Sequence, residues 1–264
     1  MLKIFRKYNY GLVLSGGGAR AYAHVGVLKA LHEHGIFPEL LSCVSAGAIV
    51  GALYADGYSP EDMMKLFSHR SLIDYVSFTI PRNGLVKHTK IQSFLQEKLR
   101  SRTFADLKLP LTIAVTNYNE GIVEYISEGD LIPVILASCS IPVVFTPTCI
   151  NRTYYFDGGL LDNLPVLPVY GKCRCIIGSH VNPIGREEEA SGVLKIAERT
   201  FHLGATKIAR QHIPMLDIFI EPQELSAYGM FDFSKAEVLY TIGYNEAMKK
   251  LKNKKSFHAK TKDL

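Results

Sequence analysis

The sequence has no tryptophan, few cysteines and no long apolar run. Its five cysteines are odd in number and show no C-x-x-C spacing, so neither a disulfide framework nor a zinc site is indicated. No stretch approaches the roughly 18 to 20 apolar residues of a membrane-spanning helix, because Ser45, Gly47 and Gly51 interrupt the longest one, Cys43–Leu53. The N-terminus carries positive charge without the apolar region of a secretory signal. These absences favour a protein of the reducing cytoplasm.

Most of the chain also lacks an excess of positive charge. The net charge is +5, but residues 249–264 hold seven lysines and one acid, so residues 1–248 carry 23 basic and 24 acidic side chains. A block of like charges most often forms a solvated end and less often contacts anionic lipid. We therefore expect one domain over residues 1–251 and a basic, disordered tail over residues 252–264. Peripheral contact with the inner membrane face fits this tail, whereas nucleic-acid binding is not expected.

Apolar periodicity predicts that strands and helices alternate at the start of the chain. Tyr10–Ser15 reads as a strand that ends in a glycine cluster and precedes a helix, Glu39–Val44 as a second strand, and Ala46–Asp56 as a second helix that ends at Gly57. This alternation implies a parallel sheet covered on its faces by helices. Further helices are expected from Pro60, with Ser59 as N-cap, over Thr89–Arg100, from an Asp130 cap to about Ser138, and over Gly192–His212 and Ser234–Leu251. Further strands are expected over Leu111–Thr116 and Ile122–Ser127, as a hairpin, and over Tyr154–Phe156, Cys175–Val181 and Leu216–Ile220.

The segment Cys43-Val44-Ser45-Ala46-Gly47 has the layout of a nucleophile elbow, in which a strand stops at a serine and a helix starts at once. Such a serine exposes its hydroxyl at the carboxyl edge of the sheet, beside the N–H groups of the helix start. The alternative is that Ser45 is an ordinary helix N-cap.

Gly16, Gly17 and Gly18 offer unshielded N–H groups at the start of a helix, which is a site suited to an anion. A dinucleotide site would need an acid at the end of the second strand, where Ser45 stands instead, and a P-loop would need Gly-Lys-Ser/Thr where the chain has Arg20. The third interpretation is an oxyanion hole that faces Ser45.

Asp157 is a candidate base for Ser45, because it lies at a strand end and is followed by Gly158 and Gly159. Its alternative is a simple Asp-Gly turn. A hydrolase triad of Ser45, Asp157 and either His180 or His202 is also conceivable, although an elbow after the second strand comes early for that fold.

These features together resemble the patatin-like phospholipase family over about Gly11 to Pro168. The blocks that carry the resemblance are Gly16-Gly17-Gly18-Ala19-Arg20 with His24-Val25-Gly26-Val27-Leu28, then Ser45-Ala46-Gly47, Ala137-Ser138-Cys139-Ser140-Ile141-Pro142, and Asp157-Gly158-Gly159 leading to Asp162-Asn163-Leu164-Pro165-Val166. Two positions depart from the pattern, since Ala21 and Cys43 stand where the family has glycine.

The resemblance implies a three-layer α/β/α sandwich with a mainly parallel sheet, and a serine acyl hydrolase that cleaves fatty-acyl esters of phospholipids or lysophospholipids. It implies Ser45 as nucleophile and Asp157 as proton acceptor, without histidine, metal or organic cofactor. The implied oxyanion hole comprises Gly16, Gly17, Gly18, Arg20 and Ala46, with Gly47, Gly158 and Gly159 as supporting residues of the motifs. The segments Leu72–Ile80 and Ile141–Pro147 are apolar and line either an acyl channel or the core. The rival function is a catalytically impaired lipid-binding or scaffold protein, in which Cys43 spoils the elbow, and a dinucleotide-binding oxidoreductase is a more distant alternative.

Overall fold

The computed structural model describes residues 6–68, 88–186 and 192–252. The apolar segment expected between Ser68 and Val86, which includes Leu72–Ile80, lies outside the described residues except for Ser68 itself. The part of the expected tail after Lys252 also lies outside them.

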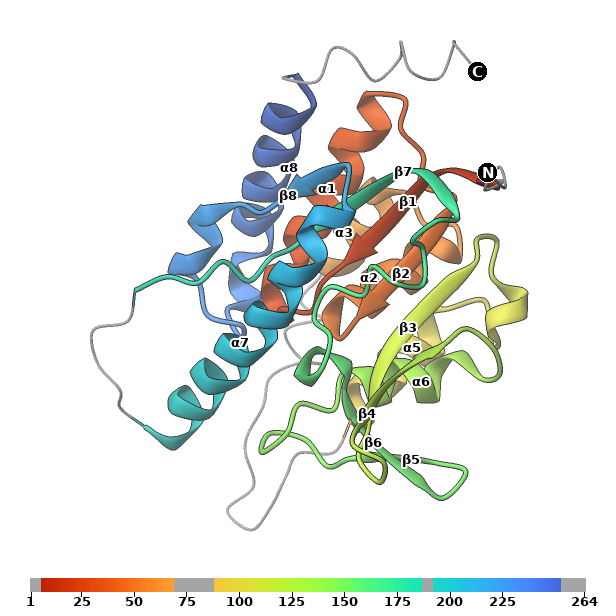
Figure 1. Cartoon of the computed structure of the whole chain (residues 1–264), viewed down its shortest axis with the longest axis vertical. Coiled ribbons are helices and arrows are strands. Elements are labelled where there is room, and N and C mark those ends of the chain that lie inside the picture. The colour runs from red at the N-terminus through yellow and green to blue at the C-terminus, as the bar shows by residue number, and fades with distance from the viewer. Residues whose placement is uncertain (1–5, 69–87, 187–191, 253–264) are drawn as a thin grey trace.

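The described residues form one eight-stranded sheet (Figure 1). Its strands are β1 Tyr8–Leu14, β2 Leu40–Val44, β3 Leu111–Asn117, β4 Ile122–Ile126, β5 Thr148–Ile150, β6 Thr153–Asp157, β7 Cys173–Ser179 and β8 Ile218–Ile220. The order is β5-β6-β3-β2-β1-β7-β8, and β4 also pairs with β3. All pairs along β3-β2-β1-β7-β8 are parallel, whereas β4, β5 and β6 are antiparallel to their neighbours. The predicted mainly parallel sheet is confirmed.

Helices cover both faces of this sheet. They are α1 Tyr22–Glu33, α2 Ala46–Ala55, α3 Pro60–Ser68, α5 Thr89–Lys98, α6 Leu131–Ser138, α7 Val193–His212 and α8 Ala236–Lys252. Alternate residues of β1 point to opposite faces, so Leu12 and Leu14 join the larger core, with α1, α2, α5, α6 and α8, while Val13 joins a smaller core with Ala209 of α7. The predicted three-layer sandwich is confirmed.

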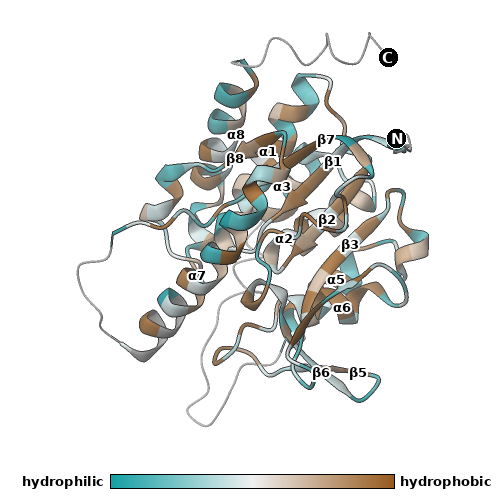
Figure 2. Ribbon diagram, viewed as in Figure 1, coloured by the Kyte–Doolittle hydropathy of each residue, from teal (hydrophilic) through white to brown (hydrophobic). Residues whose placement is uncertain are grey.

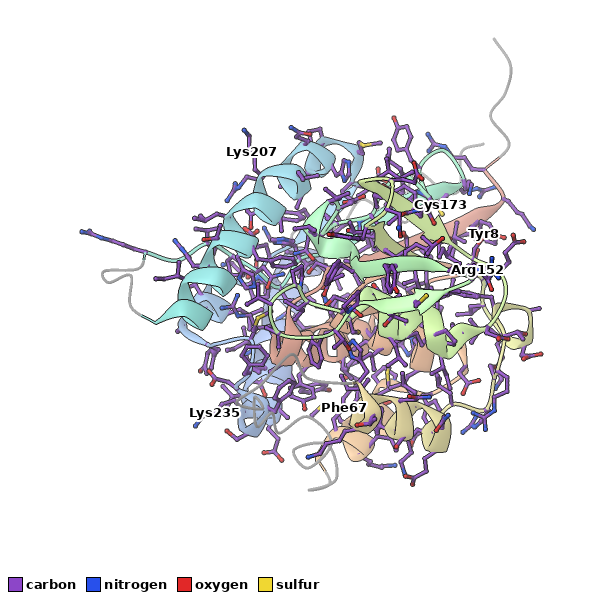
Figure 3. The ribbon with its side chains drawn as sticks, turned by 90° about the horizontal axis from the view of Figure 1, so that it is seen from below. Tyr8, Phe67, Arg152, Cys173, Lys207 and Lys235 are labelled. Atoms are coloured by element: carbon purple, nitrogen blue, oxygen red, sulfur yellow. The ribbon has the colours of Figure 1, made fainter. Side chains whose placement is uncertain are left out.

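The hydropathy of the ribbon follows these layers. Figure 2 shows the central strands mostly brown, whereas the outer helices alternate between brown and teal. Side chains fill the space between the layers in the view from below (Figure 3), in which Tyr8 and Cys173, paired at the start of β1 and β7, lie close together.

Local signals account for several ends of elements. Ser59 caps α3 as expected, because its Oγ accepts a hydrogen bond of 3.1 Å from the N–H of Asp62. Gly57, with φ of 95°, follows the end of α2. Asp130 stands at the N-cap position of α6, but its side chain makes no capping hydrogen bond, so that part of the expectation is wrong.

The strand β5 was not predicted. It pairs with β6 across a tight turn at Asn151 and Arg152, whose φ angles are 49° and 69°. Two consecutive left-handed residues suit a hairpin, but Asn-Arg is a weak signal for such a turn, since the second position usually holds glycine.

The bounds of two other strands differ by a few residues from the predicted ones. The strand β7 runs from Cys173 to Ser179 rather than from Cys175 to Val181, and β8 is shorter than expected. The N–H of Val181 donates instead to the Ser15 Oγ, at 3.0 Å.

Candidate active site

Ser45 lies on the turn between β2 and α2 in a strained backbone conformation, with φ of 54° and ψ of −132°. Few non-glycine residues adopt a positive φ, and such strain persists only where the surroundings enforce it. Here the N–H of Ser45 donates to the Ser138 Oγ at 2.7 Å, and that hydroxyl donates to the Ala114 carbonyl at 2.8 Å. The Ser45 side chain makes no capping hydrogen bond to α2, so its interpretation as an ordinary N-cap is wrong.

Two glycines of α2 create the space that this turn needs. A Cβ at Gly47 would lie 2.4 Å from the Ser15 carbonyl oxygen, so only glycine lets the first turn of α2 come so close to the end of β1. One helical turn later, a Cβ at Gly51 would lie 2.4 Å from the Cys43 Sγ. The cysteine that replaces the first glycine of the elbow is therefore accommodated, because its sulfur fills the space opposite Gly51.

Asp157 is the last residue of β6 and is 1% exposed. A Cβ at Gly158 would lie 2.2 Å from the Ala114 carbonyl oxygen, so only glycine lets the chain after β6 pass so close to the backbone of β3. The N–H of Gly159 donates to the Asp157 Oδ1 at 2.8 Å, and the Ser45 side chain lies near enough to this carboxylate to favour its ionised form. Of the two glycines that follow Asp157, Gly158 thus permits the close approach to β3 and Gly159 orients the carboxylate.

Burial raises the pKa of Asp157 to about 7, although the nearby Ser45 hydroxyl and the Gly159 N–H oppose this shift. A carboxylate in water has a pKa of about 3.9 and is a weak base. With a pKa near 7, this carboxylate is a stronger base, and about half of it is ionised at neutral pH.

The glycine loop after β1 lies against Ser45. A Cβ at Gly16 would lie 2.8 Å from the Ser45 Cβ, and the N–H of Gly16 donates to the Asn163 Oδ1 at 3.0 Å. This N–H is therefore engaged and does not point freely into the site. Within the described ranges, the N–H groups of Gly17, Gly18 and Ala46 have no hydrogen-bond acceptor.

Glycine is required at both of the next positions of the loop. Gly18 has φ of 56°, and a Cβ there would lie 2.2 Å from the Met230 carbonyl oxygen. Gly17 has φ of 155°, and a Cβ there would lie 2.6 Å from the Val181 Cγ2. Ala21, where the family has glycine, has ordinary helical angles, so its methyl group causes no strain.

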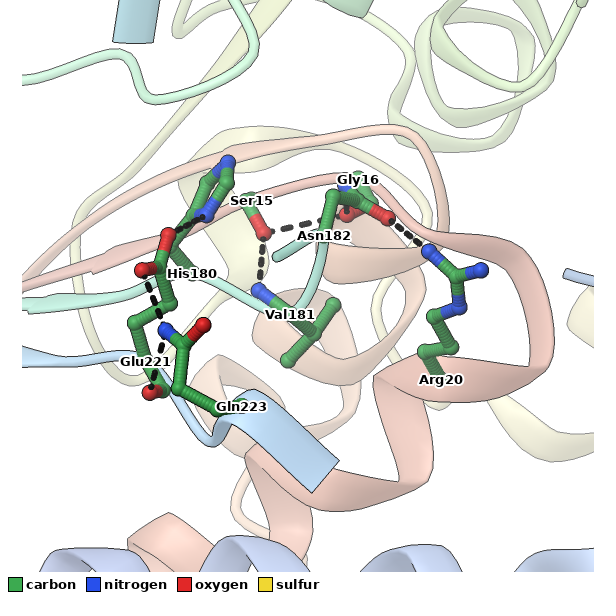
Figure 4. Close-up of polar contacts among 8 residues, drawn as sticks. All are labelled: Ser15, Gly16, Arg20, His180, Val181, Asn182, Glu221 and Gln223. Atoms are coloured by element: carbon green, nitrogen blue, oxygen red, sulfur yellow. Dashed lines mark hydrogen bonds and ion pairs between the residues drawn. The ribbon is translucent and has the colours of Figure 1, made fainter. Parts of the chain in front are cut away.

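Arg20 holds the loop to the C-terminal part of the chain. Its Nε donates to the Tyr228 carbonyl at 2.7 Å. Its Nη1 donates to the Asn182 Oδ1 at 3.4 Å (Figure 4). These contacts are those of a residue that supports the loop.

An apolar pocket opens beside Ser45 and encloses an empty volume of about 770 Å³, part of it continuous with solvent. Its walls come from η1 (Gly18–Ala21), α1, α2, α3, α5, the residues after α6 and the segment before α8. The lining is almost wholly apolar: Gly18, Ala21, Tyr22, Ala46, Ile49, Val50, Phe67, Ile91, Phe94, Cys139, Ile141, Phe145, Phe231 and Phe233, together with Ser45. Ile141 and Phe145 of the predicted apolar loop thus line a cavity.

The structure favours neither of the two histidines considered for a triad. His180 is buried, and its Nδ1 lies 2.9 Å from the Glu221 Oε1. Burial lowers the pKa of His202 to about 3, which makes it a poor base. Among the hydrogen bonds of the described residues, none joins either histidine to Ser45 or Asp157. These contacts give the triad no support.

Sequence reasoning assigned no role to three side chains that build the site. Ser138 holds the elbow, Asn163 binds the glycine loop, and Asn182 donates to the Gly16 carbonyl at 2.5 Å. Ser138 and Asn163 stood in conspicuous motif blocks, and their polarity within apolar surroundings was the available signal. Asn182 carried no such signal.

Comparison with known proteins points to one family. The model of the patatin-like phospholipase family matches residues 12–170, which is more than half of the chain. An "uncharacterized NTE family protein" of Mycobacterium bovis is 32% identical over 162 residues, covering 61% of this chain and 45% of the relative. Lysophospholipase NTE1 of Kluyveromyces lactis is 27% identical over 267 residues, covering 89% of this chain and 18% of that protein. The chain thus spans less than half the length of these curated relatives.

One solved structure supports the fold independently. VipD from Legionella pneumophila superposes with a TM-score of 0.55 at 16% identity, covering 94% of this chain and 67% of that one. Among the helices that the structure describes, none is long and apolar enough to cross a bilayer.

Proposed function

Because the chain belongs to the patatin-like phospholipase family, we propose that it hydrolyses fatty-acyl esters of phospholipids or lysophospholipids. Ser45 is the nucleophile, Asp157 is the general base, and the N–H groups of Gly17, Gly18 and Ala46 form the oxyanion hole.

The observation that carries this proposal is the contact between Ser45 and Asp157. A buried carboxylate whose pKa is raised to about 7 lies near enough to the hydroxyl of a strained strand-to-helix turn for that hydroxyl to influence its ionisation. A nucleophile and a base within hydrogen-bonding reach form the minimal unit of covalent acyl transfer. His180 binds Glu221, and burial lowers the pKa of His202 to about 3, so we assign neither histidine a part in the reaction.

In the first half-reaction the Ser45 Oγ attacks the ester carbonyl and its proton passes to the Asp157 carboxylate. The tetrahedral intermediate then collapses, the ester C–O bond breaks, and the departing alcohol takes the proton from Asp157. In the second half-reaction water attacks the acyl-serine and gives a proton to Asp157. The Ser45 oxygen leaves as the fatty acid forms, and it recovers that proton.

The oxyanion of both intermediates would be held by the glycine loop and the start of α2. The N–H groups of Gly17, Gly18 and Ala46 lack an internal acceptor in the described part of the chain. They are therefore available to donate hydrogen bonds to the oxyanion as its negative charge develops. The positive end of the α2 dipole lies at the same place.

The apolar pocket suits the fatty-acyl chain. It opens beside Ser45, and phenylalanine and aliphatic side chains line it, so an acyl chain would lose its contact with water there. This lining favours a long-chain ester over a short, polar acyl group.

The rival interpretation, a non-hydrolytic lipid-binding protein, depends on a damaged elbow. The fit of the Cys43 sulfur opposite Gly51 removes the steric reason for such damage. A dinucleotide-binding oxidoreductase would need an acid at the end of β2, where Ser45 follows Val44 instead.

A long-chain fluorophosphonate tests nucleophile and pocket together. We expect intact-mass analysis to show one added phosphonyl group, peptide mapping to place it on Ser45, and Ser45→Ala to abolish it. Ser93→Ala, a change of the same kind on α5, is the matched control and should label as the parent does. Labelling of another residue, or none at all, would overturn the proposal.

A further inference from the structure

The carbonyl group of Gly16 is held by two side-chain donors behind the glycine loop. The Asn182 Nδ2 donates to it at 2.5 Å and the Ser15 Oγ at 3.0 Å (Figure 4). A single hydrogen bond would satisfy a buried carbonyl group, so two converging donors fix its direction as well.

The direction of this carbonyl sets the direction of the next N–H. The Gly16–Gly17 peptide is planar and trans, because the described chain contains no cis peptide bond, so the Gly17 N–H points opposite to the Gly16 carbonyl. The carbonyl points toward Asn182, and the α-carbon of Gly16 lies against Ser45. The Gly17 N–H therefore points away from Asn182.

Glycine residues do not hold this peptide in place by themselves, because they rotate freely. The surrounding structure restrains it at several points. The N–H of Gly16 is bound by Asn163, the Asn182 side chain packs on Gly17, and Arg20 donates to the Asn182 Oδ1.

Asn182 itself is held by the backbone of its own segment. The N–H of His180 donates to the Ile220 carbonyl at 2.9 Å, and the N–H of Val181 donates to the Ser15 Oγ. Asn182 is almost completely buried, so its amide keeps one orientation.

We propose that Asn182, assisted by Ser15, is a positioning residue that aims the Gly17 N–H at the oxyanion by holding the Gly16 carbonyl from behind. This inference rests on the proposed hydrolase function. It adds a residue from beyond position 170 to a site whose motifs all lie before it.

The test uses Asn182→Asp in the full chain. Aspartate keeps the size of the side chain and the acceptor for Arg20, but replaces the donor to Gly16 with a second acceptor. With a soluble p-nitrophenyl ester we expect kcat to fall by about 100-fold or more, as for loss of an oxyanion-hole donor, while KM stays within about threefold.

A trifluoromethyl ketone gives a second reading, because it forms a tetrahedral oxyanion on the serine. Its inhibition constant should rise in parallel with the loss in kcat/KM, as expected for an analogue of the transition state. If Asn182 only contributed to packing, Asn182→Asp would instead lower thermal stability and raise KM, and the inhibition constant of this ketone would stay close to that of the parent. The matched control is Asn119→Asp in the β3–β4 turn, where the side-chain oxygen accepts from the Tyr154 N–H and aspartate can do the same.

Should Asn182→Asp fail to fold, Ser15→Ala tests the same carbonyl, and we expect about a tenfold fall in kcat because one donor remains. Unchanged kcat and unchanged ketone affinity in a folded Asn182→Asp protein would overturn this inference while Ser45-dependent hydrolysis persists. If the parent itself shows no Ser45-dependent hydrolysis, the proposed function fails and the inference falls with it.

Discussion

Ser45 and Asp157 meet along one edge of strand β3. Val44, the residue before Ser45, pairs with Ala114, and Asp157 pairs with Val115, the next residue of the same strand. Strand β4 pairs with both Ala114 and Val115 on the other edge of β3, so β2 and β6 lie end to end along the same edge. The two side chains therefore reach each other where β2 ends and β6 ends, and the register of both pairings decides whether they touch. A shift by one residue would turn the carboxylate to the other face of the sheet.

Loss of either side chain should remove hydrolysis. We expect Ser45→Ala and Asp157→Asn each to reduce turnover of a soluble ester by at least about 1,000-fold with the fold intact, because a nucleophile and its base act as a unit. Circular dichroism checks the fold, and Ser93→Ala is the control. Substantial activity in either variant would refute the dyad, and unchanged fluorophosphonate labelling in Asp157→Asn would leave this aspartate a structural role only.

Activity should depend on pH through Asp157. The base must be ionised, and burial raises its pKa to about 7, so kcat/KM should fall about tenfold for each pH unit below that value. A profile from pH 5 to 9 with a soluble ester checks this. Because histidine titrates in the same range, His180→Ala and His202→Ala are measured alongside and should keep the same acid limb within about tenfold of the parent rate. Loss of the limb in either variant would instead support a histidine base.

Asp157 should also destabilise the protein at neutral pH. Its pKa is raised in the folded state, so between about pH 4 and about 7 the folded protein binds more protons than the unfolded chain. The free energy of unfolding contributed by this group therefore decreases as pH rises through that window. We expect Asp157→Asn to flatten this dependence and to melt at a higher temperature than the parent at pH 8. Thermal melts of both proteins at pH 5 and 8 test it, and parallel pH dependences would contradict it.

The pair formed by Cys43 and Gly51 should couple energetically. Gly51→Ala places a Cβ 2.4 Å from the Cys43 Sγ, and we expect it to destabilise the protein by about 1 to 3 kcal/mol. Cys43→Ala removes the sulfur and should cost about 1 kcal/mol as a small cavity. The double variant should lose less unfolding free energy than the two single losses added together, because the new methyl group fills the vacated space. Urea unfolding of the four proteins measures this coupling, and simple additivity would show that the two residues do not share this space.

The lysines near the C-terminus should promote binding to anionic membranes. Lys249, Lys250 and Lys252 lie in the last turn of α8, where they complement the helix dipole, whereas the lysines from Lys254 onward have no such role in the sequence. We propose that residues 252–264 form a basic tail that contacts the inner membrane face, so truncation after Lys252 should weaken co-sedimentation with anionic vesicles at low salt. Hydrolysis of a soluble ester should stay unchanged. Equal vesicle binding by the truncated and the full-length protein would show that the tail does not contact the membrane and is a solvated end.

The sequence alone determined the elements that position the site. Apolar runs that end in glycine or serine predicted β1, β2, α1 and α2 to within a few residues, because strand and helix periodicities depend on local spacing. Gly16–Gly18, Ser45 and Asp157 could be singled out for the same reason, since each lies at or just after the end of a strand and has small neighbours.

Only the tertiary structure decided how these residues meet. The antiparallel pairing of β6 with β3 brings Asp157 to Ser45, and Gly51, eight residues along the chain, accommodates the Cys43 sulfur. Asn182 reaches Gly16 from 166 residues away. The raised pKa of Asp157 likewise arises from burial by distant segments. Such contacts depend on register and packing between remote parts of the chain, which leave no periodic trace in a single sequence, and so the roles of Ser138, Asn163 and Asn182 became visible only in the folded protein.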